Sequence, residues 1–364
     1  MLLVVKTFKE QQRKQGLGPY SFTRDCDRPT DSQINNGWGA PVKPVGLIVS
    51  SFRPSDDATQ YGFLIPANMF AVVSLRQLAE IEDKVYGNKD FSGECITLAD
   101  EVDAAIRRYG TFNHPVCGRI YAFEVDGFGN ALCMDDANVP SLLAAPYLGY
   151  CSFKDAIYQN TRKMIWSGNN PYFFKGKAGE GVGGPHVGLN YIWPMSIIMK
   201  AFTTDDSEEI RACLKQLRDT DGGTGFMHES FHSEDAADFT RSWFAWTNTL
   251  FGELILNTIK EYPNLLSQIL WKIRYWLLAM SFIFLSCGRV ADDVEANYGI
   301  IPMPNELAPM QGVYVLQGKK NSGCPFRGSR DESFSLFGGC VEKHFCNAEG
   351  YFGNGKGRYL LIYR

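Results

Sequence analysis

The spacing of apolar residues predicts that roughly the first 260 residues fold mainly into helices. In the segment 66–86, apolar residues recur at positions 70, 73, 78, 81 and 85, which places them on one helix face. Pro66 suits the first turn of this helix and Gly87 suits its end. The same criteria predict helices at 2–15, 91–108, 155–166, 193–202, 207–218 and 239–259, and a helical segment within 134–150.

One stretch departs from helical spacing. Positions 118–134 carry β-branched and aromatic residues on both sides of a glycine-rich turn at 126–130, which predicts a β-hairpin. Long loops rich in glycine and charge separate the predicted helices, for example at 20–46 and 169–188. Loops of this length in compact proteins are usually functional. The pattern therefore predicts a mainly α fold of stacked helical hairpins with functional loops between them.

The pattern changes after about position 260. An uncharged apolar run covers 275–288, which is shorter than the roughly 20 residues of a bilayer-spanning helix, so we do not expect a membrane anchor. The rest of 261–364 is rich in Gly, Ser and Cys without a periodic apolar face, and we expect it to be poorly ordered. The first sixteen residues lack the apolar core of a secretory signal peptide. The sequence thus predicts two parts, 1–260 and 261–364.

Composition excludes some function classes. The formal net charge is −4 and basic residues form no blocks, so we do not expect nucleic acid to be a partner. Aromatic residues make up 13 % of the chain, which favours a stacking or carbohydrate site. The ten cysteines include no C-x-x-C pair and are expected to be free thiols rather than metal ligands. We therefore expect a globular enzyme or binding protein.

The stretch 225–246 carries the densest candidate chemistry. Glu229 lies between His228 and His232, directly after a glycine-rich run. The string HESFH matches H-E-x-x-H, which binds zinc when a helix presents both histidines on one face, and Glu253 could supply a third ligand. The preceding glycines disfavour such a helix, and Ser233 looks like the cap of a new helix instead. Zinc proteolysis is therefore a minor alternative.

Several long strings, in one order, resemble glycoside hydrolase family 125. They are FRPSDDAT at 52–59, PANMFAVVSLRQLAEI at 66–81, EVDGFGN at 124–130, MDDANVPSLLAAPYLGY at 134–150, NPYFFKGKAGEGVGGPH at 170–186, IWPMSIIMKA at 192–201, GFMHESFH at 225–232 and TRSWFAWTNTLFGELI at 240–255. The resemblance covers about 18–259. It implies an (α/α)6 barrel, exo-acting α-1,6-mannosidase activity on mannose-containing oligosaccharides or glycans, inversion of configuration and no metal or other cofactor.

Two departures from the family pattern matter. Family members begin upstream of the position that matches Met1, and the segment after about 259 resembles nothing in the family. We therefore expect an incomplete barrel whose pocket is open on one side, and a chain that is inactive or nearly so. The alternative from another class is a non-catalytic fragment that binds mannosides weakly or does not fold.

An inverting glycosidase uses one carboxyl group as acid and a second as base. The resemblance assigns the base to Glu229. The alternative interpretation is that Glu229 is a solvated loop carboxylate without a catalytic role. The resemblance places the acid at Asp56 or Asp57 without choosing between them. Because adjacent carboxylates repel, we expect one of the two pKa values to rise, which would suit an acid. The alternative is that Ser55, Asp56 or Asp57 caps a helix.

Other polar and aromatic residues are candidate sugar contacts, each with a structural alternative. Asp135, Asp136 and Asn138 could hold sugar hydroxyls or cap the expected following helix. The remaining candidates could instead form ion pairs, loop contacts or core, and they are Arg24, Asp25, Asp27, Arg28, Arg53, His186, His228, Arg241, Trp193, Trp243 and Trp246.

Overall fold

The computed structural model describes residues 1–266 and the strand segments 300–301, 313–319, 333–337, 340–343 and 356–362. The chain divides into two compact units, Met1–Ile269 and Leu270–Arg364. In the second unit the described elements are strands: β11 (Ile300–Ile301), β12 (Val313–Lys319) and β15 (Lys356–Ile362) form one sheet, and β13 (Ser333–Phe337) pairs with β14 (Cys340–Lys343). The predicted disorder of 261–364 lies mainly outside the described residues, and the apolar run 275–288 lies outside them entirely.

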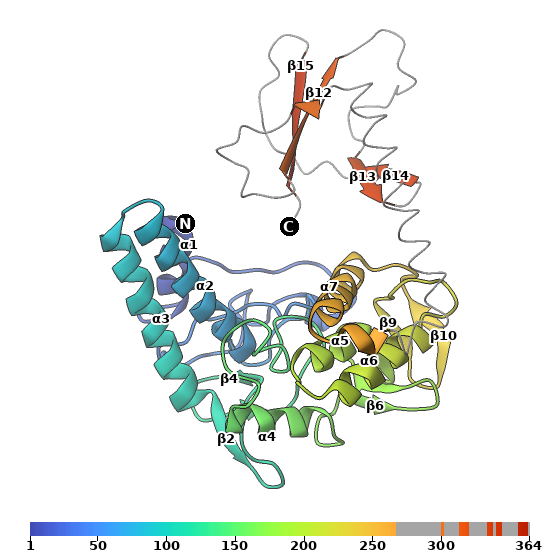
Figure 1. Ribbon diagram of the computed structural model, residues 1–364. Coiled ribbons are helices and arrows are strands. Elements are labelled where there is room, and N and C mark those ends of the chain that lie inside the picture. Colours follow the sequence, from blue (N-terminus) through green and yellow to red (C-terminus); the bar gives the residue numbers. More distant parts are fainter. Residues whose placement is uncertain (267–299, 302–312, 320–332, 338–339, 344–355, 363–364) are drawn as a thin grey trace. The chain divides into compact units, whose positions relative to one another are not determined.

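The first unit is mainly helical, with small sheets between the helices (Figure 1). Its helices are α1 (Leu2–Gln11), α2 (Ile65–Lys84), α3 (Lys89–Tyr109), α4 (Ala156–Ile165), α5 (Pro194–Phe202), α6 (Ser207–Asp219) and α7 (Ala245–Glu261), with a short 3-10 turn at Pro29–Asp31. This confirms the mainly α class. The closed (α/α)6 barrel that the resemblance implies stays a prediction. Among the described residues, no helix is both long and apolar enough to span a bilayer.

Helices α2 and α3 form a hairpin whose facing sides are apolar (Figure 1). Val72 and Leu75 on α2 are buried, as are Leu98 and Val102 on α3. Burying one such side chain stabilises the fold by about 1.5–3 kcal/mol. The turn between the helices contains Gly87 with a φ of +65°, a left-handed conformation that favours glycine. The predicted helix 66–86 is therefore confirmed, with its end close to the expected one.

Small antiparallel sheets connect the helices and position the loops. The strand β1 (Phe63–Leu64) pairs with β4 (Glu124–Val125), which pairs with β5 (Ala131–Leu132). The β4–β5 pair encloses 126–130 and confirms the predicted hairpin. The remaining strands are β2 (Thr111–His114) paired with β3 (Gly118–Tyr121), β6 (Phe173–Lys175) paired with β7 (Glu180–Val182), and a sheet of β8 (Tyr191–Ile192), β9 (Ser230–His232) and β10 (Asp235–Thr240).

Two helix predictions were wrong. The segment 134–150 contains no helix, because Pro140 and Pro146 lack the N–H groups that a helix needs and Asp135 binds the backbone ahead of it. The residues after Ser233 form strand β10 instead of a helix, because they pair with β9. The last helix of the series consequently begins at Ala245 instead of at 239.

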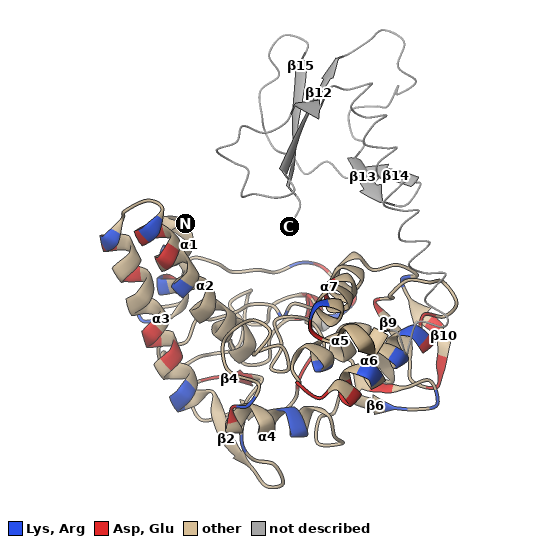
Figure 2. Ribbon diagram, viewed as in Figure 1, with Lys and Arg blue, Asp and Glu red and all other residues tan. Residues whose placement is uncertain are grey.

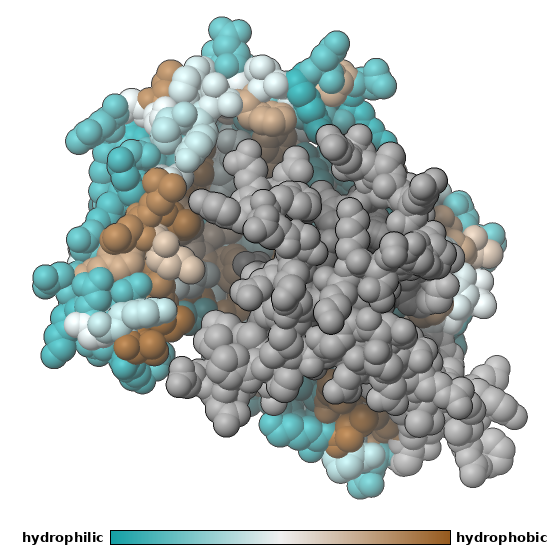
Figure 3. Space-filling model, turned by 90° about the horizontal axis from the view of Figure 1, so that it is seen from above, coloured by the Kyte–Doolittle hydropathy of each residue, from teal (hydrophilic) through white to brown (hydrophobic). Residues whose placement is uncertain are grey.

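The surface of the first unit mixes charge types. Both α3 and α6 carry acidic residues in the first turn and basic residues in the last turn (Figure 2). Figure 3 shows apolar side chains gathered at one margin, where the start of α1 lies beside the end of α2. The side chains of Leu2, Leu3 and Tyr86 are exposed there and line a cavity of about 540 Å³. A second cavity, of about 350 Å³, lies between α1 and α2.

Candidate active site

A tight turn gives the two adjacent aspartates of the FRPSDDAT string different environments. The Arg53 N–H donates to the Asp57 carbonyl at 2.8 Å, and the Asp56 N–H donates to the Arg53 carbonyl at 3.0 Å. Asp56 has a φ of +68° and an exposed side chain, whereas Asp57 is buried. The helix that follows begins at Ile65, and its N-cap is Leu64. The capping interpretation of Asp56 and Asp57 is therefore wrong, and the turn directs only Asp57 inward.

A buried ion pair anchors this turn to strand β4. The Arg53 Nε atom donates to Glu124 Oε1 at 2.6 Å, and both side chains are almost fully buried. The second Glu124 oxygen accepts the backbone N–H groups of Gln60 and Tyr61. The Arg53 Nη2 atom is buried without a hydrogen-bond partner among the described residues. One oxygen of Glu124 thus binds Arg53, and the other binds the backbone of the loop at Gln60 and Tyr61.

Ser55 connects Asp57 to a second buried carboxyl group. Its hydroxyl lies 2.8 Å from Asp57 Oδ2 and 3.2 Å from Asp136 Oδ2. The other oxygen of Asp136 accepts both the backbone N–H and the side-chain amide of Asn138. Complete burial raises the pKa of Asp136, although Asn138 and the Arg53 charge oppose this. A Cβ on Gly184 would lie 3.1 Å from the Asp136 carboxyl, so glycine lets this loop approach closely.

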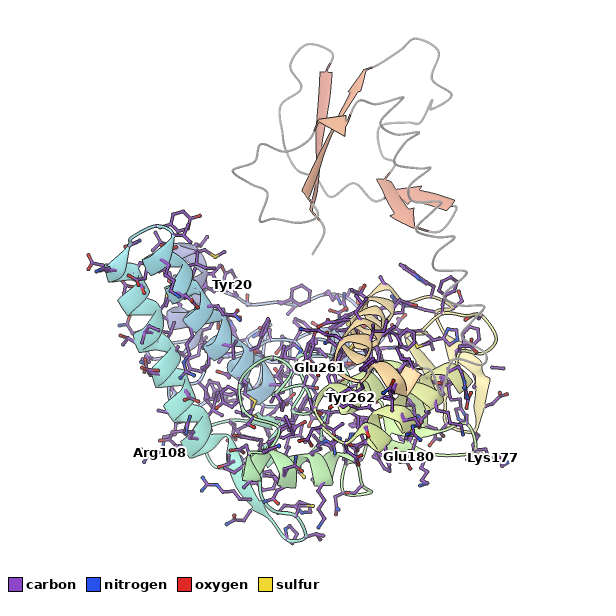
Figure 4. The ribbon with its side chains drawn as sticks, viewed as in Figure 1. Tyr20, Arg108, Lys177, Glu180, Glu261 and Tyr262 are labelled. Carbon is purple, nitrogen blue, oxygen red and sulfur yellow. The ribbon has the colours of Figure 1, made fainter. Side chains whose placement is uncertain are left out.

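His186 belongs to the glycine-rich loop, and its ring lies beside Asp57. Its Nδ1 atom lies 3.5 Å from Asp57 Oδ2, at the limit of hydrogen bonding, and has no closer partner among the described residues. Its backbone carbonyl accepts from Arg28 Nη1 at 2.9 Å. The loop follows the β6–β7 hairpin, where the side chain of Lys177 points outward in Figure 4. Arg28 and His186 therefore connect two loops that are distant in sequence.

The charge state of Asp57 differs from the sequence expectation. Burial raises the pKa of Asp57, but hydrogen bonds from His186 and Ser55 and the charges of His186 and Arg53 outweigh burial and lower it. The same contact with Asp57 raises the pKa of His186, despite partial burial. We expected repulsion between Asp56 and Asp57 to raise one of the two pKa values. That expectation was wrong for Asp57, because the turn gives it cationic neighbours.

Glu229 lies at the open end of the β9–β10 hairpin. The register pairs Ser230 with Thr240, so the next pair outward is Glu229 and Arg241. The Arg241 Nε atom lies 3.3 Å from Glu229 Oε1, with the glutamate side chain 8 % exposed and the arginine side chain 62 % exposed. The Glu229 charge also contributes to the raised pKa of His186. His186 therefore lies within electrostatic reach of both Asp57 and Glu229.

The H-E-x-x-H string does not form a helix. Ser230–His232 is strand β9, so the two histidines do not share a helix face. The Nδ1 and Nε2 atoms of His228 contact the carbonyl oxygens of Ser242 and Asp221, at 3.0 and 2.9 Å, and its ring stacks on Phe239. Both His228 nitrogens thus face the backbone, which fits a structural role. The described residues contain no cluster of three potential metal ligands.

The other predicted contacts divide into buried and exposed groups. Asp135 is fully buried, and its two oxygens accept the backbone N–H groups of Leu142 and Leu143. Burial outweighs these bonds and raises the pKa of Asp135 to about 8. Asp25 is exposed, and Trp243 is 40 % exposed. Asp135 therefore anchors the backbone, while Asp25 and Trp243 are accessible from solvent.

Sequence reasoning missed three residues of this cluster: Ser55, Glu124 and Tyr172. Tyr172 is half-buried, and burial raises its pKa, with further effects from Arg53, Asp136 and Asp57. Ser55 was noted only as a helix cap. Glu124 lies in a string that carries the family resemblance, but a single carboxylate in a two-residue strand gives no signal of burial. The two cavities described above include neither Asp57 nor Glu229 in their walls.

Comparisons with known proteins found similar chains. A curated relative, the Meiotically up-regulated gene 157 protein of Schizosaccharomyces pombe (strain 972 / ATCC 24843), is 45 % identical over 251 residues, covering 68 % of this chain and 49 % of that protein. The chain thus spans about half the length of this relative.

A solved structure also matches. It is a Streptococcus pneumoniae protein, described as one of a new family of metal-independent alpha mannosidases, in a non-productive substrate complex with alpha-1,6-mannobiose. The identity is 44 % and the TM-score is 0.70, and the match covers 71 % of this chain and 61 % of that chain. The profile of the family described as metal-independent alpha-mannosidase (GH125) matches residues 1–256. The chain therefore belongs to the GH125 family of metal-independent alpha-mannosidases.

Proposed function

We propose that this protein is an exo-acting glycoside hydrolase that releases α-1,6-linked mannose from mannosides or glycans. Family membership and the likeness to a protein studied with alpha-1,6-mannobiose support the substrate class. The observation that carries the proposal is the position of His186, within electrostatic reach of two acidic side chains from different loops, Asp57 and Glu229. Hydrolysis of a glycosidic bond needs two carboxyl groups that flank this bond.

In the proposed mechanism Glu229 is the general base. A glutamate carboxyl is ordinarily ionised near neutral pH, and the Arg241 guanidinium contacts one of its oxygens. The other oxygen is available to accept a proton from water. That water attacks the anomeric carbon from the face opposite the leaving group, so the configuration inverts. The inverting geometry leaves room for the water by keeping the two carboxyl groups about 6.5–9.5 Å apart.

Asp57 is the proposed general acid, and Asp56 is not. The turn buries Asp57 beside Ser55 and His186, while the Asp56 side chain is exposed. Asp57 donates its proton to the glycosidic oxygen as the bond to the anomeric carbon breaks. His186 and Arg28 are proposed to contact the sugar, because they come from the loops that flank Asp57. Trp243 and Asp25 are proposed outer contacts, because their side chains are accessible.

The proposal is tested by mannose release from α-1,6-mannobiose by the purified chain, with proton NMR to identify the anomer that forms first. The absence of release would contradict the proposal and favour the alternative expectation of an inactive fragment. We expect the β anomer from the α-linked substrate. Asp57→Asn should reduce release by about 10²–10⁴-fold, the usual contribution of a positioned acid. Asp56→Asn is the matched control, and it should change release less than about twofold because exposed substitutions have small effects.

Each other outcome contradicts part of the proposal. Equal losses in the two variants would contradict the choice of Asp57. An α anomer would contradict inversion. Binding of mannobiose without release would favour the mannoside-binding alternative. A chelator should leave release unchanged, whereas loss that zinc restores would favour a metal-dependent enzyme.

A further inference from the structure

Two buried carboxyl groups meet at one hydroxyl in this structure. Ser55 Oγ lies within hydrogen-bonding distance of Asp57 Oδ2 and of Asp136 Oδ2, at 2.8 and 3.2 Å. A serine hydroxyl carries one proton, and an ionised carboxylate can only accept. Ser55 can therefore donate to one of the two carboxylates only. The second contact becomes a hydrogen bond when the other carboxyl carries a proton and donates it to the Ser55 oxygen.

The surroundings show which carboxyl carries that proton at rest. Asp57 has the His186 ring at 3.5 Å and the Arg53 guanidinium within electrostatic reach, and both lower the pKa of Asp57. Asp136 is 0 % exposed, and its Oδ1 atom already accepts two hydrogen bonds from Asn138. Its Oδ2 atom faces Ser55 and is free to hold a proton. Burial disfavours the charged form of Asp136 and raises its pKa.

We propose that Asp57 and Asp136 share one proton through the Ser55 hydroxyl, and that Asp136 supplies the proton that Asp57 gives to the leaving glycosidic oxygen. The proposal rests on the assignment of Asp57 as the general acid. It explains how a carboxyl with cationic neighbours can act as an acid. Asp136 and Ser55 act through Asp57 and are positioning residues for the proton.

The transfer balances without any further reactant. The O–H bond at Asp136 Oδ2 breaks, and that proton binds Ser55 Oγ. The original Ser55 O–H bond breaks, and its proton binds Asp57 Oδ2, so one negative charge moves from Asp57 to Asp136. Asp57 then protonates the glycosidic oxygen. After product release Glu229 gives to solvent the proton that it took from the attacking water, and the pair regains one proton from solvent.

The charged and titratable groups around the pair fit a shared proton. Arg53 influences both carboxyls, so one cation accompanies the single negative charge wherever it resides. His186 faces Asp57, and Tyr172 lies near both carboxyls. Asp135 precedes Asp136 and is itself buried, and the charge of Asp57 adds to the cost of a charge on Asp136. Two like charges in one site favour a coupled pair that titrates as a unit.

The first test compares leaving groups. Asp136→Asn and Ser55→Ala should reduce kcat on α-1,6-mannobiose by about 10²-fold, the lower end for a positioned proton donor. Both variants should keep most of their activity on 2,4-dinitrophenyl α-mannoside, whose leaving group needs no proton. Ser55→Thr keeps the hydroxyl and should retain activity on both substrates. Equal losses on both substrates in Ser55→Ala and Asp136→Asn would overturn the proposal.

Asp57→Asn separates this proposal from the proposed function. It should show the same dependence on the leaving group. If Asp57→Asn loses activity equally on both substrates, the acid assignment fails and the shared proton fails with it. If Asp57→Asn shows the dependence but Ser55→Ala does not, only the shared proton fails.

The second test needs no turnover. Infrared difference spectra of the full chain at neutral pH should contain the carbonyl stretch of a buried protonated carboxyl that is absent from Asp136→Asn. In Ser55→Ala this band should shift, because its hydrogen-bond partner is lost. Asp135→Asn serves as the reference, since it removes the neighbouring buried carboxyl that does not contact Ser55. A band unaffected by Ser55→Ala and Asp136→Asn would overturn the proposal, and Ser55→Ala alone suffices if Asp136→Asn does not fold.

Discussion

The two proposed catalytic carboxyl groups are held in opposite ways. Asp57 lies in a buried network that includes Ser55, Asp136 and the Arg53–Glu124 pair, and the network connects two segments that are distant in sequence. Glu229 lies at the end of a hairpin, and its charged partner Arg241 is 62 % exposed. Both carboxyl groups are therefore buried, but Asp57 has several buried partners whereas the charged partner of Glu229 is largely exposed.

This difference indicates how acid and base roles could be divided between the two carboxyl groups. A proton can be kept on a carboxyl where water is excluded and a second carboxyl competes for charge. A base that activates water needs an ionised oxygen at the solvent boundary, with a cation nearby. Substitutions in the Asp57 region should consequently affect both stability and proton delivery. Substitutions around Glu229 should affect activity with little change in stability.

The largest expected effect belongs to Glu229. Glu229→Gln keeps the shape and the contact to water but cannot take a proton, so mannose release should fall by about 10²–10⁴-fold. Binding of mannobiose, measured by calorimetry, should stay within about threefold, since the group acts on water and not on the sugar. His232→Ala is the control and should reduce release far less. A large loss in His232→Ala that equals that of Glu229→Gln would revive the zinc interpretation.

The second-largest effect is expected in the buried network around Asp57. Glu124→Gln leaves the buried Arg53 without its countercharge and weakens the two N–H contacts of Glu124, so it should destabilise the first unit by about 3–5 kcal/mol. Thermal unfolding followed by the helical circular dichroism signal measures this. Glu94→Gln removes an exposed ion pair with Lys9 and should cost less than about 1 kcal/mol. Equal shifts in the two variants would contradict the role of burial.

The sequence predicted the helices well because long amphipathic stretches fold by their own pattern. Segments such as 66–86 and 207–218 bury one face and need no distant partner to show it. The segment 134–150 was mispredicted because its conformation depends on contacts that the buried Asp135 makes ahead of it. Strand β10 was missed because its pairing with β9 has a register shift and its side chains are largely exposed, so no alternating pattern marks it.

The sequence predicted which residues belong to the candidate site, but it did not predict their surroundings. Family resemblance pointed to Glu229 and to the pair Asp56 and Asp57, but the choice within the pair depends on a positive φ at Asp56, which sequence does not reveal. The direction of the Asp57 pKa depends on His186, which is 129 positions away. Long-range electrostatics of this kind arises only once the loops have been brought together.

The third prediction concerns pH and the buried aspartates. An unfolded Asp has a pKa of about 3.9, and burial raises the pKa of folded Asp135 to about 8. The folded state therefore holds the proton more tightly, and the stability contributed by Asp135 is complete below about pH 4 and is lost as the pH rises through about 8. The difference in free energy of unfolding between the wild type and Asp135→Asn should shrink over this range. A difference that grows with pH would contradict the raised pKa, and Asp100→Asn, at an exposed position, should show no such trend.

The smallest effect is expected at Arg241. Its ion pair with Glu229 is solvated on the arginine side, and such pairs contribute about 0.2–1 kcal/mol. Arg241→Ala should therefore lower kcat/KM by no more than about fivefold, the rate equivalent of that energy. The φ of +48° at this position is costly for a side chain with a Cβ, so Arg241→Gly should be at least as stable as Arg241→Ala.

Salt separates the electrostatic part of this effect. Added salt screens exposed charges, so the gap in kcat/KM between the wild type and Arg241→Ala should narrow as ionic strength rises. Arg211→Ala removes a comparable exposed ion pair with Glu208 on α6 and should leave kcat/KM unchanged. A loss at Arg241 as large as that of Glu229→Gln, insensitive to salt, would mean that the arginine contacts the sugar directly. Arg241 would then bind the substrate as well as pair with the proposed base, Glu229.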